Sequence, residues 1–239
     1  MEYLIDHQTQ LAIAARIDRA VEQVLSELPN HGGEEGLTSA LGHALMQQSF
    51  QSDYLRVSFK YRQLSKYTEE PAVGADGGFL VRVTNTDTSV QKAALFQAKL
   101  IRGSARVRQL TMSTAEVNRL QDQARNMLTQ TDQAVAVFYT PNQVYVVDAA
   151  DYQSRQTPDA RRPLSQEHRL ITLGTYLGRW IPRCTKGDQN SALIKRIEHV
   201  DGFKQGLEMD VISKRPSISS NDDKAEVLWK QARPRRSPQ

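Results

Sequence analysis

The segment GADGGFLVRVTNTDTSVQKAALFQAKL, residues 74–100, decides the fold of this protein. It contains two apolar runs separated by the polar sequence NTDT, a pattern that predicts a β-hairpin. With the turn near position 87, antiparallel pairing places Asp76 opposite about position 98. Gln97 and Lys99 share a face because side chains alternate along a strand. The hairpin therefore brings a carboxylate, an amide and an ammonium group together at one end.

These three groups suit phosphodiester chemistry that uses a divalent cation. Mg²⁺ takes oxygen ligands, commonly one or two carboxylates together with phosphate and water. A nearby lysine orients the attacking water and favours its deprotonated form. Each residue alone has an ordinary explanation, since Asp76 would suit a tight turn and Lys99 would suit a strand edge that reaches solvent. Their convergence on one face favours a functional site.

Length and composition indicate an ordinary globular protein. The 239 residues are 39% apolar and 24% charged, which fits one sizeable domain with a small appendage. We expect neither a signal peptide nor a membrane span, because the N-terminal sequence lacks a basic start with an apolar core and no apolar run approaches the ~20 residues needed. The single cysteine, Cys184, fits a reducing compartment, so we expect a cytoplasmic protein.

The high isoelectric point of about 9.2 belongs to the C-terminal end of the chain. Residues 214–239 contain seven basic and three acidic residues, a net charge of +4, which equals the formal charge of the whole chain. Residues 1–213 therefore sum to zero. We expect a disordered basic tail over 214–239, with a DNA-contacting arm as the alternative. Any nucleic-acid binding by residues 1–213 must therefore depend on particular side chains and not on net charge.

The remaining patterns predict a helix, three strands, a helix and two strands. Helical spacing, cap residues and alternation are the signals. We divide the chain into a core with an N-terminal helix (1–148), a C-terminal extension with a short amphipathic helix (149–213) and the tail. The predicted helices are 9–28, 34–50 and 115–128, the last with a capping box that uses Glu116, and the predicted strands are 54–64, two within 74–100, 134–140 and 144–149.

The sequences GADGGF (74–79) and FQAK (96–99) resemble the catalytic signature of the PD-(D/E)xK nuclease superfamily. The resemblance is to the branch with glutamine in the last motif, as in Mrr-type restriction enzymes and anti-phage effector nucleases. It covers roughly residues 34–148. It implies an α/β fold with a restriction-endonuclease-like core, in which helices flank a central mixed sheet, and here a small C-terminal helical extension.

The resemblance also implies a role for each site residue. Asp76 would be the central ligand of Mg²⁺ or Mn²⁺, Gln97 the second side-chain ligand and Lys99 the catalytic lysine. The carbonyl of Ala98 would complete the shell. A glutamate on the first core helix would be Glu35, with Glu34 as the second candidate.

Two departures from the family pattern matter. Alanine replaces the proline before Asp76, which changes little. Gln97 replaces the usual acid, so the site has one negative charge fewer and should bind metal more weakly unless Glu35 contributes.

Further residues are candidates for DNA contact. Arg102, Arg106 and Arg108 follow the motif lysine and would hold phosphates, or else form a solvated loop. Gln121 and Arg125 lie four apart on the next helix, on a face that lines the cleft in related proteins, although exposed polar positions are the simpler interpretation.

The resulting hypothesis is a metal-dependent DNA endonuclease acting on double-stranded DNA in bacterial anti-phage defence or restriction. A partner protein of a defence system and a homo-oligomer are compatible with it. A catalytically silent nuclease-like module that binds DNA or recruits a partner is the rival hypothesis, and an RNA-directed toxin of the same fold is a third.

Overall fold

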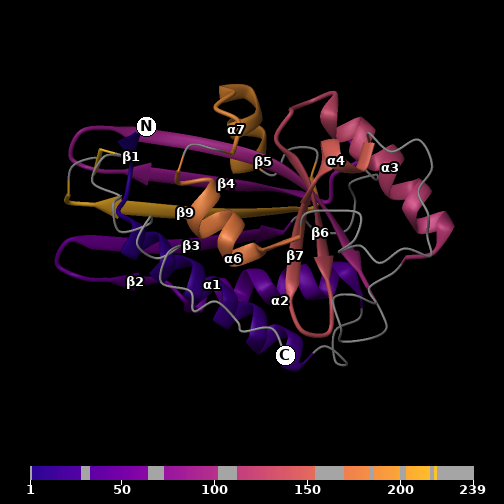
Figure 1. Cartoon of the computed structure of the whole chain (residues 1–239), viewed down its shortest axis with the longest axis horizontal. Coiled ribbons are helices and arrows are strands. Elements are labelled where there is room, and N and C mark those ends of the chain that lie inside the picture. Colours follow the sequence, from indigo (N-terminus) through magenta and orange to yellow (C-terminus); the bar gives the residue numbers. More distant parts are fainter. Residues whose placement is uncertain are drawn as a thin grey trace, which may run out of the picture.

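An eight-stranded mixed sheet with helices on both sides forms the centre of the protein (Figure 1). The computed structural model describes residues 2–27, 33–63, 73–101, 112–153, 170–183, 186–199, 203–215 and 218–219. The strand order in the sheet is β2-β3-β9-β4-β5-β6-β7-β8, and a separate small sheet pairs β1 with β10. The strands are β1 (Glu2–Tyr3), β2 (Phe50–Gln51), β3 (Leu55–Gln63), β4 (Gly77–Thr84), β5 (Ser89–Leu100), β6 (Ala134–Tyr139), β7 (Val144–Asp148), β8 (Ile171–Thr172), β9 (Gln205–Ser213) and β10 (Ile218–Ser219).

The helices divide between the two faces of the sheet, as Figure 1 shows. One face, the α1 face, is covered by α1, α2, α6 and the π-helical turn η3. The opposite face, the α3 face, is covered by α3, α4 and α7. Their bounds are α1 (His7–Ser26), α2 (Glu34–Gln47), α3 (Thr114–Leu128), α4 (Ala149–Gln153), α6 (Leu173–Thr175), η3 (Tyr176–Trp180) and α7 (Ser191–His199).

Alternation along the central strands builds a separate apolar core on each face. On β5, Phe96 and Ala98 pack into the core on the α1 face, whereas Ala93 and Leu95 pack into the core on the α3 face. The same parity places Gln97 and Lys99 on the α3 face, at the end of the strand. Strand β5 is buried on both faces, but on the α3 face its last two side chains, Gln97 and Lys99, are polar.

The hairpin predicted from residues 74–100 is confirmed. Strands β4 and β5 pair antiparallel with Gly77 opposite Phe96, so the register places Asp76 opposite position 97, within one residue of the prediction. The Asp76 N–H extends the ladder by donating to the Phe96 carbonyl at 2.9 Å. The central mixed sheet flanked by helices is likewise as expected.

The predicted helices form, with small shifts at their ends. Helix α3 begins after Ser113, whose hydroxyl accepts from the N–H of Glu116 while the Glu116 carboxylate accepts from the N–H of Ser113, a complete capping box. Helix α1 begins at His7, earlier than predicted, because the carboxylate of Asp6 accepts from the N–H of Thr9 and caps it. No described helix has the length and apolar character required to cross a membrane.

The expected helical extension over residues 149–213 is wrong at its C-terminal end. Residues 205–213 form β9, which lies between β3 and β4, antiparallel to the former and parallel to the latter. Its odd-numbered residues Leu207, Met209 and Val211 are buried in the core on the α1 face. Glu208 and Asp210 lie on the other face in ion pairs with arginines, which accounts for acidic residues inside a central strand.

The start of the predicted tail is also ordered. The Lys214 N–H donates to the carbonyl of Tyr54 at 2.9 Å, and the guanidinium of Arg215 lies 4.1 Å from the centre of the Tyr54 ring. Residues 218–219 pair with residues 2–3, close to the N-terminus. The prediction of disorder is therefore wrong for this part, and residues 220–239 lie outside the described residues.

Candidate functional site

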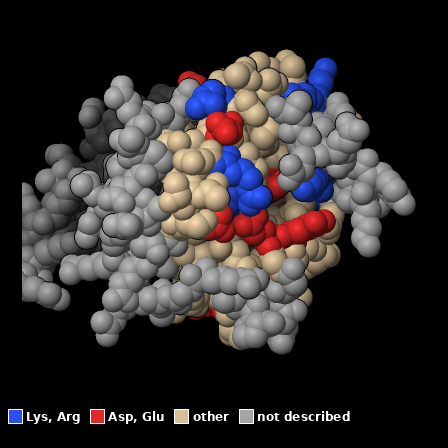
Figure 2. All heavy atoms as spheres, turned by 90° about the vertical axis from the view of Figure 1, so that its right-hand side faces the viewer, with Lys and Arg blue, Asp and Glu red and all other residues tan. Residues whose placement is uncertain are grey.

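A pocket of about 250 Å³ lies where β4 and β9 begin and β5 ends. This end of the sheet is on the right in Figure 1 and faces the viewer in Figure 2, where a basic area borders a row of acidic side chains. The pocket contains three acidic and three basic side chains together with four neutral polar ones. Its lining residues are Glu34, Glu35, Thr38, Asp76, Gln97, Ala98, Lys99, Arg119, Gln123, Lys204 and Gln205.

Asp76 lies at the centre of this arrangement. Its Oδ2 accepts hydrogen bonds from the backbone N–H of Ala98, at 2.9 Å, and from the side-chain amide of Gln97. The same amide lies 3.2 Å from the Ala98 carbonyl oxygen. The three residues expected to share a metal thus lie in direct contact, across one rung of the β4–β5 pair.

Backbone contacts fix Asp76 from both sides. Its N–H bonds to Phe96 of β5, and its carbonyl accepts from the N–H of Lys204, at 3.1 Å, where the chain enters β9. Gly77 permits this approach, because a Cβ there would lie 2.5 Å from the carbonyl oxygen of Gln205 and 2.6 Å from the Phe96 ring. The glycine after Asp76 is therefore needed to pack β9 and β5 against the site.

Lys99 is buried and faces the start of α2. Its side chain is only 3% exposed, and its Nζ lies 3.6 Å from a carboxylate oxygen of Glu34. The other oxygen of Glu34 accepts from the N–H of Leu100 at 3.0 Å. Glu34 is the first residue of α2, directly after Gly33, whose φ of 127° is a conformation that favours glycine. That turn directs the helix N-terminus at the end of β5.

Of the two candidate glutamates, Glu34 is the one in contact with the motif. Glu35 lines the pocket but is exposed, and its Oε1 accepts from the side-chain amide of Gln63 at 3.1 Å. Successive helical residues point about 100° apart, so only one of the two can face Lys99. Both glutamates line the pocket, and the contacts with Lys99 and Leu100 favour Glu34 over Glu35 as the site glutamate.

The two residues of α3 that were expected to contact DNA do not line the pocket. Arg119 and Gln123 line the pocket, whereas Gln121 and Arg125 do not. Arg125 instead pairs with Asp122 at the surface, at 2.8 Å. The helix turns a different face to the pocket because Val117, Leu120 and Ala124 anchor it to the sheet. Arg102, Arg106 and Arg108 lie outside the described residues.

Lys204 and Gln205 are site residues that sequence analysis missed. Both come from the start of β9, a strand that was not predicted. The alternation Leu207, Glu208, Met209, Asp210, Val211 is a strand signal, but nothing local indicates that the strand pairs with β4.

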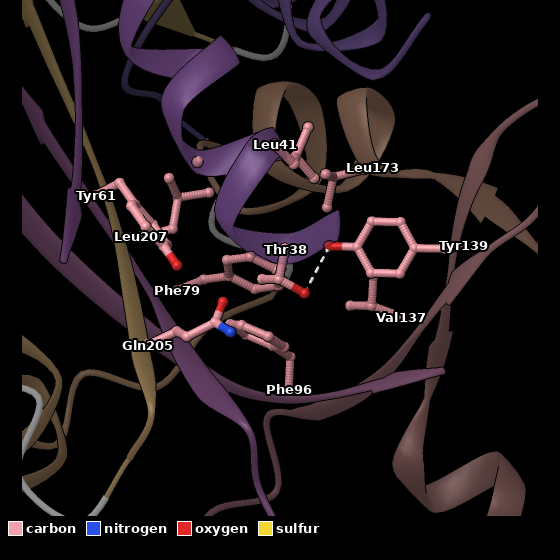
Figure 3. Close-up of a pocket in the computed structure, with 11 residues that line it drawn as sticks. Thr38, Leu41, Tyr61, Phe79, Phe96, Val137, Tyr139, Leu173, Gln205 and Leu207 are labelled. Atoms are coloured by element: carbon pink, nitrogen blue, oxygen red, sulfur yellow. Dashed lines mark hydrogen bonds between the residues drawn. The ribbon is translucent and has the colours of Figure 1, made fainter. Parts of the chain in front are cut away.

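A second, small pocket lies next to the site, and Figure 3 shows the residues that line it. Thr38 and Gln205 line both the site pocket and this small pocket, which has a volume of about 20 Å³ and is also lined by residues of α2. The buried hydroxyl of Tyr139 donates to Thr38 at 3.0 Å, and burial raises the pKa of this tyrosine. The hydroxyl of Thr38 in turn donates to the Glu34 carbonyl, so the base of the pocket connects to the first turn of α2.

Electrostatics make Asp76 an unusual carboxylate. Burial raises its pKa above the ordinary 3.8, while the Ala98 N–H and the ammonium groups of Lys99 and Lys204 act in the opposite direction. The charge of Glu34 adds to the upward shift. Burial thus destabilises the ionised carboxylate of Asp76 more than its neighbours stabilise it. A bound cation would stabilise the ionised form.

The donor set fits a hard divalent cation in chemical type. Asp76 and Glu34 supply carboxylates, and Gln97 and Ala98 supply neutral oxygens, which are the ligands that Mg²⁺ and Mn²⁺ take. The Gln97 amide would have to rotate so that its oxygen replaces its nitrogen. Within the described residues no group of three or more His, Cys, Asp or Glu side chains is arranged to hold a metal. No protein-family model, curated protein or solved structure matches the chain.

Proposed function

We propose that this protein is a metal-dependent phosphodiesterase that cleaves DNA, with a restriction-endonuclease-like core of the PD-(D/E)xK type. The observation that carries the proposal is the contact of Asp76 with Gln97 and the Ala98 N–H, on the strand that also presents Lys99. The order α2, β3, β4, β5, α3, β6, with β5 and β6 parallel, is also that of the proposed core, although β9 separates β3 from β4.

Each residue has a defined task in this proposal. Asp76, Gln97 and Glu34 hold the cation, with the carbonyl of Ala98. Lys99 lies beside them, where its ammonium orients the attacking water and stabilises negative charge that develops on the phosphoryl group. Arg119 of α3, which also lines the pocket, binds the phosphate backbone.

Mg²⁺ or Mn²⁺ would supply Lewis acidity at a phosphoryl oxygen and lower the pKa of water. The chain contributes a fixed geometry, because the Asp76 backbone is bonded to both β5 and β9. Double-stranded DNA is the proposed substrate, and anti-phage defence or restriction in the cytoplasm is the proposed setting. A partner protein and self-association are compatible with this role.

One observation favours a second candidate, a silent module that binds nucleic acid or a partner. The motif residues have partners within the chain, since Asp76 accepts two hydrogen bonds and Lys99 lies near Glu34. Such a cluster can persist without chemistry. The presence of the whole set of Asp76, Gln97 and Lys99 nevertheless favours the enzyme, because a silent copy would tolerate the loss of one.

Cleavage assays separate the two candidates. Purified protein is incubated with plasmid, linear duplex, single-stranded DNA and RNA, each with Mg²⁺, Mn²⁺ or EDTA. We expect cleavage of duplex DNA that EDTA abolishes and that Lys99→Ala eliminates, while Lys195→Ala, at an exposed position of α7, retains it. Metal-independent cleavage, or a folded Lys99→Ala protein with full activity, would refute the proposal, and preferential cleavage of RNA would redirect it.

A further inference from the structure

The start of β9 places a second lysine in the site. The Lys204 N–H donates to the carbonyl of Asp76 at 3.1 Å, and the next residue, Gln205, is in register with both Gly77 of β4 and Gln63 of β3. The position of Lys204 is therefore set by pairing on both sides of β9. It does not depend on the lysine side chain.

Strand parity directs this side chain to the catalytic side of the sheet. On β9 the even-numbered residues Glu208 and Asp210 lie on the α3 face, with Arg82 of β4. Asp76, Gln97 and Lys99 lie at the end of the same face. Lys204 lines their pocket, and its positive charge partly offsets the rise in the pKa of Asp76 that burial causes.

The two lysines of the pocket differ in their partners. Lys99 is almost fully buried, and its Nζ lies 3.6 Å from Glu34. Lys204 is partly exposed, and its ammonium forms no ion pair with any carboxylate of the described residues. An ammonium held at a pocket wall without a carboxylate partner is available to an anion from outside the chain.

We propose that Lys204 binds a backbone phosphate of the nucleic acid, next to the phosphodiester group that is cleaved. This inference rests on the proposed function and names a contact that β9 adds to the hairpin motif. The pocket, at about 250 Å³, is smaller than the roughly 300–1,000 Å³ of sites that enclose whole small molecules. It suits the backbone of an extended polymer. Lys204 thus contributes to DNA affinity, while Lys99 acts in the cleavage step.

The salt dependence of DNA binding tests this contact. Affinity for a duplex oligonucleotide is measured with Ca²⁺ between 50 and 200 mM salt, for wild type, Lys204→Met, Lys204→Arg and the exposed control Lys195→Met. Each lost phosphate contact lowers the slope of log affinity against log salt by about 0.9. The advantage of wild type over Lys204→Met should therefore shrink about 3.5-fold across this range, and Lys204→Arg should restore the wild-type slope.

Three results would overturn the inference, and they are distinguishable. If Lys204→Met has the same salt slope and affinity as Lys195→Met, Lys204 does not contact a phosphate, and the proposed function is unaffected. A Lys204→Met protein that loses cleavage but binds with the wild-type slope shows that Lys204 acts through Asp76. Wild-type protein that neither binds nor cleaves any nucleic acid overturns the proposed function and this contact together. Thermal unfolding of each variant confirms that the fold is retained.

Discussion

Two charged clusters lie on the same face of β4 and β9, and they differ in how their charges are paired. Toward the far ends of the strands, Arg82 contacts Glu198, Glu208 and Asp210 at 2.7, 2.8 and 2.9 Å. Lys60 and Arg62 of β3 add ion pairs to Asp210 and Glu208. At the near ends, Asp76 and Lys204 share a backbone hydrogen bond, yet no side-chain ion pair joins them among the described residues.

Both clusters contain three cations and three carboxylates, so net charge does not separate them. In the first cluster, named here the Arg82 network, each acid lies within 3.3 Å of a cation. In the site, the single ion pair among its lining residues is that of Lys99 with Glu34, at 3.6 Å. The paired charges of the Arg82 network join β3, β4, β9 and α7. The less closely paired charges of the site remain available to a cation and a phosphate. The pairing of charges is thus the feature that separates the Arg82 network from the candidate site.

The largest expected effect is at the site. Asp76→Asn should lower the cleavage rate at least ~100-fold, because it removes the carboxylate at the centre of the cation site. It should not lower the free energy of unfolding, because the burial of Asp76 already penalises its charged form. Initial cleavage rates and urea unfolding measure the two effects. A large loss in the free energy of unfolding would mean that Asp76 has a structural role, as the paired acids of the Arg82 network do.

The opposite pattern is expected in the Arg82 network. Arg82→Met should lower the free energy of unfolding by about 3 kcal/mol, because it leaves the buried carboxylate of Glu208, 2% exposed, without its closest cation. Cleavage well below the melting temperature should continue. The surface pair Arg125–Asp122 provides the control, and Arg125→Met should cost less than about 1 kcal/mol. Equal losses for the two arginine variants would contradict the structural role assigned to the network.

The sequence predicted the convergence of the three hairpin side chains better than it predicted the strand order of the sheet. Asp76, Gln97 and Lys99 lie on a hairpin whose turn and alternation are local signals, so their convergence followed from strand geometry. The insertion of β9 between β3 and β4 is a pairing across more than a hundred residues, which local patterns do not encode. The phase of α3 was missed for the same reason. Helical spacing predicts that Arg119 and Gln123 share a face, but only docking decides which face meets the pocket.

A smaller effect, on metal affinity, is expected from Gln97, the residue that departs from the family motif. Gln97→Glu adds a carboxylate beside Asp76, which should lower the Mg²⁺ concentration for half-maximal cleavage by about tenfold. Without metal, the two adjacent carboxylates should repel, and the melting temperature should fall. Mg²⁺ should then raise the melting temperature more than it does in wild type. Superimposable metal titrations of Gln97→Glu, wild type and Gln97→Met would show that position 97 is not a ligand.

The smallest effect is a dependence of stability on pH, and its sign is what matters. Burial raises the pKa of Asp76 above 3.8, so just above pH 4 the folded protein holds a proton that the unfolded chain has released. The contribution of Asp76 to the free energy of unfolding therefore falls as pH rises through this window, and stays low above the raised pKa. Asp76→Asn has no such proton, so its stability relative to wild type should increase from pH 4 upward and then level off.

Urea unfolding at a series of pH values from 4 to 8, without divalent metal, measures this difference. Asp53→Asn, at an exposed position, corrects for the loss of an ordinary surface charge. Adding Mg²⁺ should remove the advantage of Asp76→Asn at high pH, because a cation stabilises the ionised carboxylate only in the folded state. A relative stability that decreases with rising pH would mean that Asp76 is held ionised by its neighbours, as the acids of the Arg82 network are, and that the site already resembles its paired counterpart.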